Sequence, residues 1–274
     1  MKSFFSTVTA AMALCLGSAR ADLLDSGVVP KEQLNTTAVA MAAAAQNFDC
    51  NFPARRLNRG DCEYLQRIGF SNQGSNADRP GNGAWIGSDG TYTFKFTNDA
   101  NHPGPVGVII VLWLMEGPKD YQASFVNARQ PRITVSLPNQ GDSVVISLAE
   151  GQIGAWAAVN GHNTVLTQYG QISNTWGEFN TKRVGNTFDI SKEVDMQGNF
   201  MEIRANNGCV ANEDLCVFKC INGARSCGNA GEYKIFNCGP PNPGAQSAPD
   251  GMNGGCSGWG NNGRGHLDVS LRRY

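Results

Sequence analysis

The pattern of apolar and polar positions predicts a chain built mainly from short β-strands. Residues 91–96 read TYTFKF, where aromatic and polar side chains alternate as they do in a strand with one buried face. Residues 106–115 read VGVIIVLWLM, an almost unbroken apolar run that we expect to form a central strand covered on both faces. This run is too short to cross a membrane.

Two further alternating segments, 132–137 (RITVSL) and 143–148 (SVVISL), are joined by a turn-rich connection, which predicts a hairpin. In the final segment, Leu267, Val269 and Leu271 share one face, so we expect this segment to pair into a sheet. Frequent glycine and asparagine between the strands favour an antiparallel β-sandwich or barrel, so the fold class is mainly β. Shorter strands are expected at 153–159, 187–190, 200–204, 217–219, 234–237 and 266–272.

The N-terminal part of the chain has a different character. Residues 1–21 combine an early lysine, an apolar run and the ending Ala-Arg-Ala, which is the pattern of a cleaved secretory signal peptide. Residues 22–70 form an expected N-terminal segment, partly disordered, with a short helix where Tyr64, Leu65 and Ile68 lie at helical spacing. Residues 71–274 form the expected β-rich secreted domain, which begins with a loop over 71–87. The glycine-rich stretch 251–265, which contains a cysteine, is expected to form a disulfide-pinned surface loop.

The cysteines indicate an oxidising compartment. Removal of the leader leaves an even set of eight, which in an exported chain predicts four disulfides, three of them in the C-terminal third. The connectivity cannot be read from spacing, although Cys50 and Cys62 could pair with each other across 11 residues, and the last six would then staple the C-terminal third. Cys216 and Cys220 also have a spacing found in zinc sites, but no histidine lies in the cluster, so we expect no metal and no cofactor. The eight are Cys50, Cys62, Cys209, Cys216, Cys220, Cys227, Cys238 and Cys256.

Composition and charge restrict the partners. Apolar residues make up 41% of the chain and charged residues 16%, which is typical of a folded globule rather than a disordered chain. The net charge of −1 becomes −3 when the leader is removed with Lys2 and Arg20. Such a charge favours neither a nucleic acid nor a membrane as partner. Asn35 begins the one N-glycosylation sequon, so we expect a glycan there.

Few residues suggest chemistry. No nucleophile elbow, zinc-binding helix or phosphate-binding loop occurs, and no catalytic residue is assigned. Glu178 follows a Trp-Gly pair, so a carboxylate beside an indole could serve a glycosidase if Glu116 or Asp268 lay within roughly 5–10 Å of it. Aromatic residues near expected loops could also contact sugar rings. The candidate binding residues are Trp156, Tyr169, Trp176, Glu178 and Trp259.

The order of these segments resembles the fungal secreted allergens typified by the Aspergillus group-four allergen. The resemblance is collinear over about 180 residues, and TWGEF at Thr175–Phe179 is its most specific element. It implies a secreted, mostly β domain of fungal origin that hosts meet as an antigen, without an established catalytic activity. The matching pieces are TYTFKF, VIIVLWLMEGP, RITVSLPNQG, GAWAA, TWGEF and the ending GGCSGWGNNGRGHLDVSL.

Three hypotheses about function follow. The first is a non-enzymatic, allergen-like or effector-like extracellular protein that acts at the cell wall or the host interface, with a cell-wall polysaccharide or a host protein as partner. The second is a cell-wall carbohydrate-active enzyme of the glycoside hydrolase type that uses Glu178. The third is a structural wall component without a specific ligand, which predicts that all tryptophans are buried.

Overall fold

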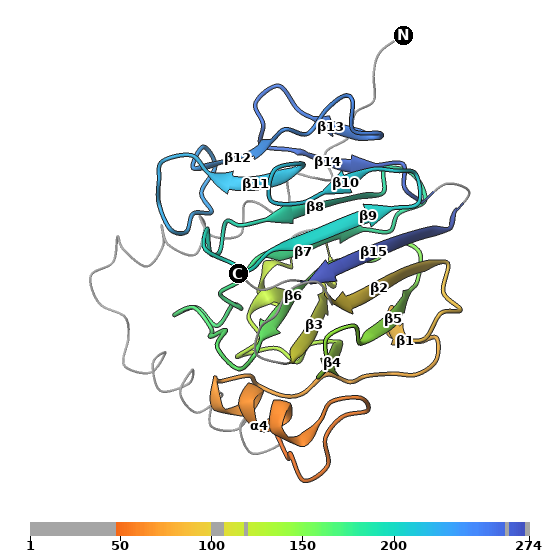
Figure 1. The fold of residues 1–274 in the computed structure, drawn as a ribbon, viewed down its shortest axis with the longest axis vertical. Coiled ribbons are helices and arrows are strands. Elements are labelled where there is room, and N and C mark those ends of the chain that lie inside the picture. The colour runs from red at the N-terminus through yellow and green to blue at the C-terminus, as the bar shows by residue number, and fades with distance from the viewer. Residues whose placement is uncertain (1–47, 100–106, 118–119, 261–262, 272–274) are drawn as a thin grey trace.

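The computed structural model describes residues 48–99, 107–117, 120–260 and 263–271. The strands among these residues build two β-sheets that pack against each other as a sandwich (Figure 1). The first sheet has six strands in the order β1-β5-β2-β15-β9-β10. Its strands are β1 Ala84–Ile86, β2 Tyr92–Asn98, β5 Ser143–Leu148, β9 Met201–Ala205, β10 Val210–Ala211 and β15 Gly265–Leu271.

The second sheet has nine strands. Seven follow the order β12-β11-β8-β7-β6-β3-β4, and β14 pairs with both β8 and β13. Figure 1 shows β12, β13 and β14 at one end of the molecule and the single described α-helix, α4, at the other. Its strands are β3 Val108–Leu114, β4 Ile133–Leu137, β6 Ile153–Asn160, β7 Trp176–Asn180, β8 Thr187–Ser191, β11 Val217–Cys220, β12 Tyr233–Phe236, β13 Ala245–Ser247 and β14 Gly254–Ser257.

The main core lies between the two sheets and follows from the alternation in the sequence. In β2, Tyr92, Phe94 and Phe96 are fully buried, whereas Lys95 between them is exposed. Phe94 packs against the ring of Trp156 on β6, with ring centroids 5.1 Å apart. Aromatic side chains from both sheets therefore fill the space between them, which contributes much of the free energy of folding.

A second core covers the other face of the nine-stranded sheet. Helix α4, Arg59–Arg67, begins after Asn58, whose side chain accepts a hydrogen bond from the Asp61 amide. Leu65 of this helix is fully buried, and the Cys50–Cys62 disulfide holds the preceding loop to the helix. The expected helix and the suggested pairing are both confirmed. The apolar residues of β3 pack on both sides, since all seven are buried.

The two sheets are mixed rather than purely antiparallel. β15 lies between β2 and β9, as Figure 1 shows, and runs parallel to β2 and antiparallel to β9. β11 is also parallel to its neighbour β8. The expectation that the last segment enters a sheet is confirmed over Gly265–Leu271. Because β15 joins strands that come much earlier in the chain, its direction is set by long-range pairing that local pattern does not reveal.

Three local expectations were wrong. The segments 132–137 and 143–148 do not form a hairpin, because β4 pairs with β3 in one sheet and β5 pairs with β1 and β2 in the other. The connection between them therefore crosses from sheet to sheet. The expected loop over 71–87 contains the short edge strand β1. The glycine-rich stretch 251–265, expected as a surface loop, contains β14 and the fully buried Trp259.

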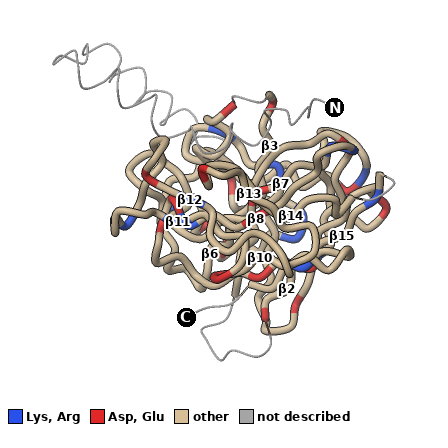
Figure 2. Tube along the Cα trace, turned by 90° about the horizontal axis from the view of Figure 1, so that it is seen from above, with Lys and Arg blue, Asp and Glu red and all other residues tan. Residues whose placement is uncertain are grey.

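Charged residues of the described chain are spread over the molecule rather than gathered by sign. Figure 2 shows acidic and basic positions interspersed along the trace. Across the described residues, no helix has the length and apolar character needed to span a bilayer. The expected signal peptide, residues 22–47 and the sequon at Asn35 lie outside the described residues.

Candidate functional site

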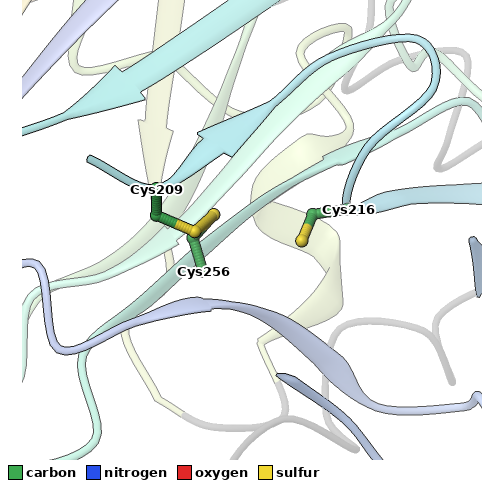
Figure 3. Close-up of side chains that lie close together, drawn as sticks. All are labelled: Cys209, Cys216 and Cys256. Carbon is green, nitrogen blue, oxygen red and sulfur yellow. A yellow bond between two sulfur atoms is a disulfide. The ribbon is translucent and has the colours of Figure 1, made fainter. Parts of the chain in front are cut away.

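The C-terminal cysteines form disulfides, as the sequence predicted. The pairs are Cys209–Cys256, Cys216–Cys238 and Cys220–Cys227. Among the described residues, one set of three potential metal-ligand atoms lies within 4.8 Å of one another, and it consists of the sulfurs of Cys209, Cys216 and Cys256. Figure 3 shows Cys209 joined to Cys256, with Cys216 beside them. Sulfurs committed to disulfides are not thiolates, so this cluster is a structural staple and not a zinc site.

The candidate binding residues do not form one exposed surface. Trp156 and Trp259 are fully buried, and Trp176 is 7% exposed, because all three belong to the packed cores of the nine-stranded sheet. Tyr169 lies apart from them, in the loop between β6 and β7, and is 43% exposed. All five tryptophans are buried, which is the outcome that the structural-component hypothesis predicted.

A pocket nevertheless forms around Glu178 on the outer face of the nine-stranded sheet. It encloses about 530 Å³ of empty space, its mouth to solvent included. The short 3-10 helix η1, Tyr121–Ser124, contributes to one side of it, and β3, β6, β7 and β8 contribute to the other. Its lining residues are Trp113, Met115, Asp120, Tyr121, Ala123, Ser124, Gly154, Ala155, Gln171, Trp176, Glu178, Ser191, Glu193 and Val194.

Strand register explains why Glu178 faces this pocket. In β7, Trp176 and Glu178 alternate with Gly177, which instead faces the main core against the ring of Trp156. A Cβ at Gly177 would overlap atoms of that ring, so a residue without a side chain is needed there. The TWGEF motif thus places the side chains of Trp176 and Glu178 on the outer face of the sheet. Its glycine, Gly177, packs against the buried Trp156 on the other face.

The apolar side of the pocket is built from two tryptophans. The rings of Trp113 and Trp176 contact edge to face, with centroids 4.9 Å apart. The indole N–H of Trp176 donates to the carbonyl of Ile172 at 2.9 Å, which fixes its ring. On the polar side, Gln171 donates from its amide nitrogen to the hydroxyl of Ser124 at 3.1 Å. The pocket therefore combines rigid aromatic surface with neutral hydrogen-bonding groups.

Three carboxyl groups share a desolvated environment at this site. Glu178 on β7 lies directly opposite Asp189 on β8 in the antiparallel register, and Glu193 follows β8. Burial raises the pKa of Glu178 to about 7. Burial, together with the charges of the neighbouring carboxylates, raises the pKa of Asp189 and of Glu193 well above the ordinary values. Glu178 is the partly exposed member, and it lines the pocket together with Glu193.

Asp195 shows what Asp189 lacks. Burial would raise its pKa, but hydrogen bonds from the Gln197 amide and Ser173, with the Arg225 guanidinium, hold the pKa below the ordinary value. Asp189 has no such support, because its buried Oδ1 accepts no hydrogen bond from the described residues. The three-acid cluster is therefore a place where negative charge is unfavourable in the unliganded protein.

The second carboxylates suggested for an enzyme, Glu116 and Asp268, do not line the pocket. Asp268 lies on β15 in the six-stranded sheet, and its side chain is 61% exposed. Glu116 is 67% exposed and lies near Arg129 and Arg132. The carboxyl groups whose pKa values respond to the charge of Glu178 are instead Asp189 on β8 and Glu193 just after it. Sequence reasoning missed Asp189 and Glu193, although the alternation in TFDIS could have placed Asp189 on one face of a strand.

A known protein family matches the part of the chain that forms the pocket. The family model of the Allergen Asp f 4-like domain matches residues 84–230, more than half of the chain. The chain belongs to this family. The match contains every residue that lines the pocket, whereas β12 to β15 lie beyond it. The resemblance noted in the sequence is confirmed.

Two further comparisons add little. No curated protein matches the chain. Among solved structures, the thaumatin-like xylanase inhibitor TLXI aligns with 14% identity and a TM-score of 0.31, over 65% of this chain and 97% of the inhibitor. At this level of similarity the alignment carries no inference about activity. The function of the Asp f 4-like domain must therefore be argued from its own pocket.

Proposed function

We propose that this protein is a secreted, non-enzymatic fungal allergen-like or effector-like factor that binds glycan through the Glu178 pocket, at the cell wall or the host interface. The observation that carries the proposal is the partly exposed residue Glu178, which lines an open pocket beside Trp113 and Trp176. Family membership and four disulfides support the extracellular setting.

The chemistry of the pocket suits a sugar. Carboxylate oxygens accept hydrogen bonds from sugar hydroxyls, and the Ser124 hydroxyl and Gln171 amide can both donate and accept. The apolar edges of the two tryptophans offer contacts to the C–H groups of a sugar ring. Because the tryptophans are buried, binding would rely on the mouth of the pocket and not on an exposed aromatic platform.

The test is a depletion assay with the oxidised protein and insoluble polysaccharides. We expect loss of the protein from solution in the presence of at least one of chitin, deacetylated chitin, β-glucan or cellulose. Glu178→Gln should reduce that loss, whereas the matched change Asp268→Asn, at an exposed carboxylate in the other sheet, should not. Equal depletion of the two variants, or no depletion by any polysaccharide, would contradict the proposal.

A second candidate function is glycoside cleavage, and one observation favours it. With a pKa raised to about 7, Glu178 holds a proton in mildly acidic solution and could donate it to a leaving-group oxygen. Release of soluble reducing sugar in the same assay, abolished by Glu178→Gln, would support this function. Depletion without sugar release would support binding alone.

A further inference from the structure

We propose that the pocket selects sugars that carry a protonated amino group, so its ligand class is an oligomer of glucosamine units rather than a neutral glucan. This inference rests on the proposed glycan-binding function and names the ligand class of the same site. The juxtaposition behind it is an acidic cluster, Glu178, Asp189 and Glu193, beside the aromatic side chains of Trp113 and Trp176.

The cluster lacks a cation of its own in the described part of the chain. None of the described lining residues is a lysine or an arginine. Three described basic residues of neighbouring segments have other partners: Arg129 pairs with Asp120, Lys192 with Glu213 and Arg225 with Asp195. Lys182 and Arg183, which follow β7, do not line the pocket. An ammonium group in the pocket would therefore supply the positive charge that the cluster does not have.

Asp189 provides an independent sign that the site is incomplete. Its side chain is 5% exposed, and its Oδ1 has no hydrogen-bond partner among the described residues. It lies opposite Glu178 across the strand pair, and its pKa responds to the charges of both Glu178 and Glu193. A buried carboxylate without a partner is costly, so a bound cation that lies among these groups gains more from them than a neutral ligand does.

The site suits an organic ammonium better than a metal ion. Among the described residues, the carboxylate oxygens of the cluster do not form a set of three within 4.8 Å of one another, since only the cysteine sulfurs do so. A metal ion holds its oxygen ligands at about 2–2.6 Å, so the ligand atoms must also lie close to one another. An ammonium on a sugar ring can instead contact one carboxylate and an aromatic ring together, as cations do beside tryptophan. The Ser124 hydroxyl and Gln171 amide would then meet the hydroxyls of the ring.

Binding should weaken both at low pH and at high pH. The titratable groups that line the pocket are Glu178 from β7, Glu193 after β8, and Asp120 and Tyr121 at η1, and Asp189 on β8 lies beside Glu178. In acid the cluster is protonated and loses its attraction for a cation. In alkali the amino group of the sugar loses its proton and its charge. Affinity is therefore expected to pass through a maximum, and binding below neutral pH should release protons as the carboxyl groups ionise.

The experiment is isothermal titration calorimetry with the oxidised, full-length secreted protein and four soluble probes. These are tetramers of glucosamine, N-acetylglucosamine and glucose, and tetralysine as a cation without a sugar. At the pH of maximal affinity, we expect the glucosamine tetramer to bind at least about tenfold more tightly than each of the others. Glu178→Gln should remove that preference, and Asp268→Asn should keep it. Titration in two buffers of different ionisation enthalpy should show the release of protons.

Several outcomes would overturn the inference. If all three sugar tetramers bind equally and Glu178→Gln weakens them equally, the pocket binds glycan but does not select the amine, and the proposed function remains. If tetralysine binds as tightly as the glucosamine tetramer with the same dependence on Glu178, the site recognises cations rather than amino sugars. If no sugar binds, the proposed function and the inference both fall. Thermal unfolding of each variant confirms that the comparison concerns folded protein.

Discussion

Glu178 on β7 and Asp189 on β8 are cross-strand partners on the outer face of the nine-stranded sheet. Like charges at directly opposite positions destabilise a strand pair, and the surrounding apolar residues make that repulsion stronger than it would be in water. The Glu178–Asp189 pair is therefore expected to lower the stability of the folded protein. Ionisable groups with strongly shifted pKa values cluster at functional sites, and the pocket beside Glu178 is the candidate site here.

Stability should fall as the pH rises from about 5 to 8. Burial raises the pKa of Glu178 from 4.5 to about 7, so the folded state binds a proton that the unfolded state has already released in this range. The loss due to Glu178 is on the order of 1–3 kcal/mol in the free energy of unfolding, and the raised pKa values of Asp189 and Glu193 extend it to higher pH. Urea unfolding at pH 5 and pH 8 measures it.

Glu178→Gln isolates the contribution of one group. The variant should be more stable than the wild type at pH 8 and nearly equal to it at pH 5, because glutamine resembles the protonated acid. Asp268→Asn, on an exposed strand position, should follow the wild type at both values. A stability that rises from pH 5 to pH 8, or an unchanged slope in Glu178→Gln, would contradict the assignment of the titration to this cluster.

Gly177→Ala should destabilise the protein by about 1–3 kcal/mol, because the new methyl group would overlap the buried ring of Trp156. Gly117 offers a matched control, since a Cβ there meets no atom within 4 Å. Gly117→Ala should change the unfolding free energy by less than about 1 kcal/mol. Chemical denaturation measures both variants, and equal stabilities would show that the main core can shift away from β7.

Tyr64→Phe should cost about 1 kcal/mol, because the hydroxyl of Tyr64 donates to the buried carbonyl of Thr164 at 2.7 Å and so joins helix α4 to the loop after β6. Tyr169→Phe, at an exposed tyrosine of the same loop, should leave stability unchanged. The measurement is again the free energy of unfolding. If the two variants behave alike, the hydrogen bond does not hold α4 to the sheet.

Removal of the Cys209–Cys256 disulfide should destabilise the protein more than removal of Cys220–Cys227. The first joins residues 47 positions apart and the second residues 7 apart. The entropy of the unfolded chain then predicts losses of about 4 and about 2 kcal/mol. Double Cys→Ala variants of each pair, compared by thermal unfolding, measure the difference. The reverse order would mean that native packing, and not loop closure, sets the contribution of each bridge.

The amino-acid sequence by itself determined the elements whose signal is local. Alternation at 91–96 predicted β2, the apolar run at 106–115 predicted the doubly buried β3, and helical spacing around Tyr64 predicted α4. The bridge between Cys50 and Cys62, which their short separation along the chain had suggested, is present. In each case the residues that make the structure are neighbours along the chain, so the pattern and the physical cause coincide.

Only the tertiary structure decided which strands are neighbours. The sequence pattern of β4 and β5 fits both a hairpin and two strands in separate sheets. The parallel pairing of β15 with β2 joins residues about 170 positions apart. The site was decided in the same way. Glu178 could be singled out beside its tryptophan, but its pKa is raised by burial in the folded protein. Its charge raises the pKa of Asp189, which lies opposite it only when β7 pairs with β8. Desolvation and charge coupling act across space, so neither can be assigned from sequence position alone.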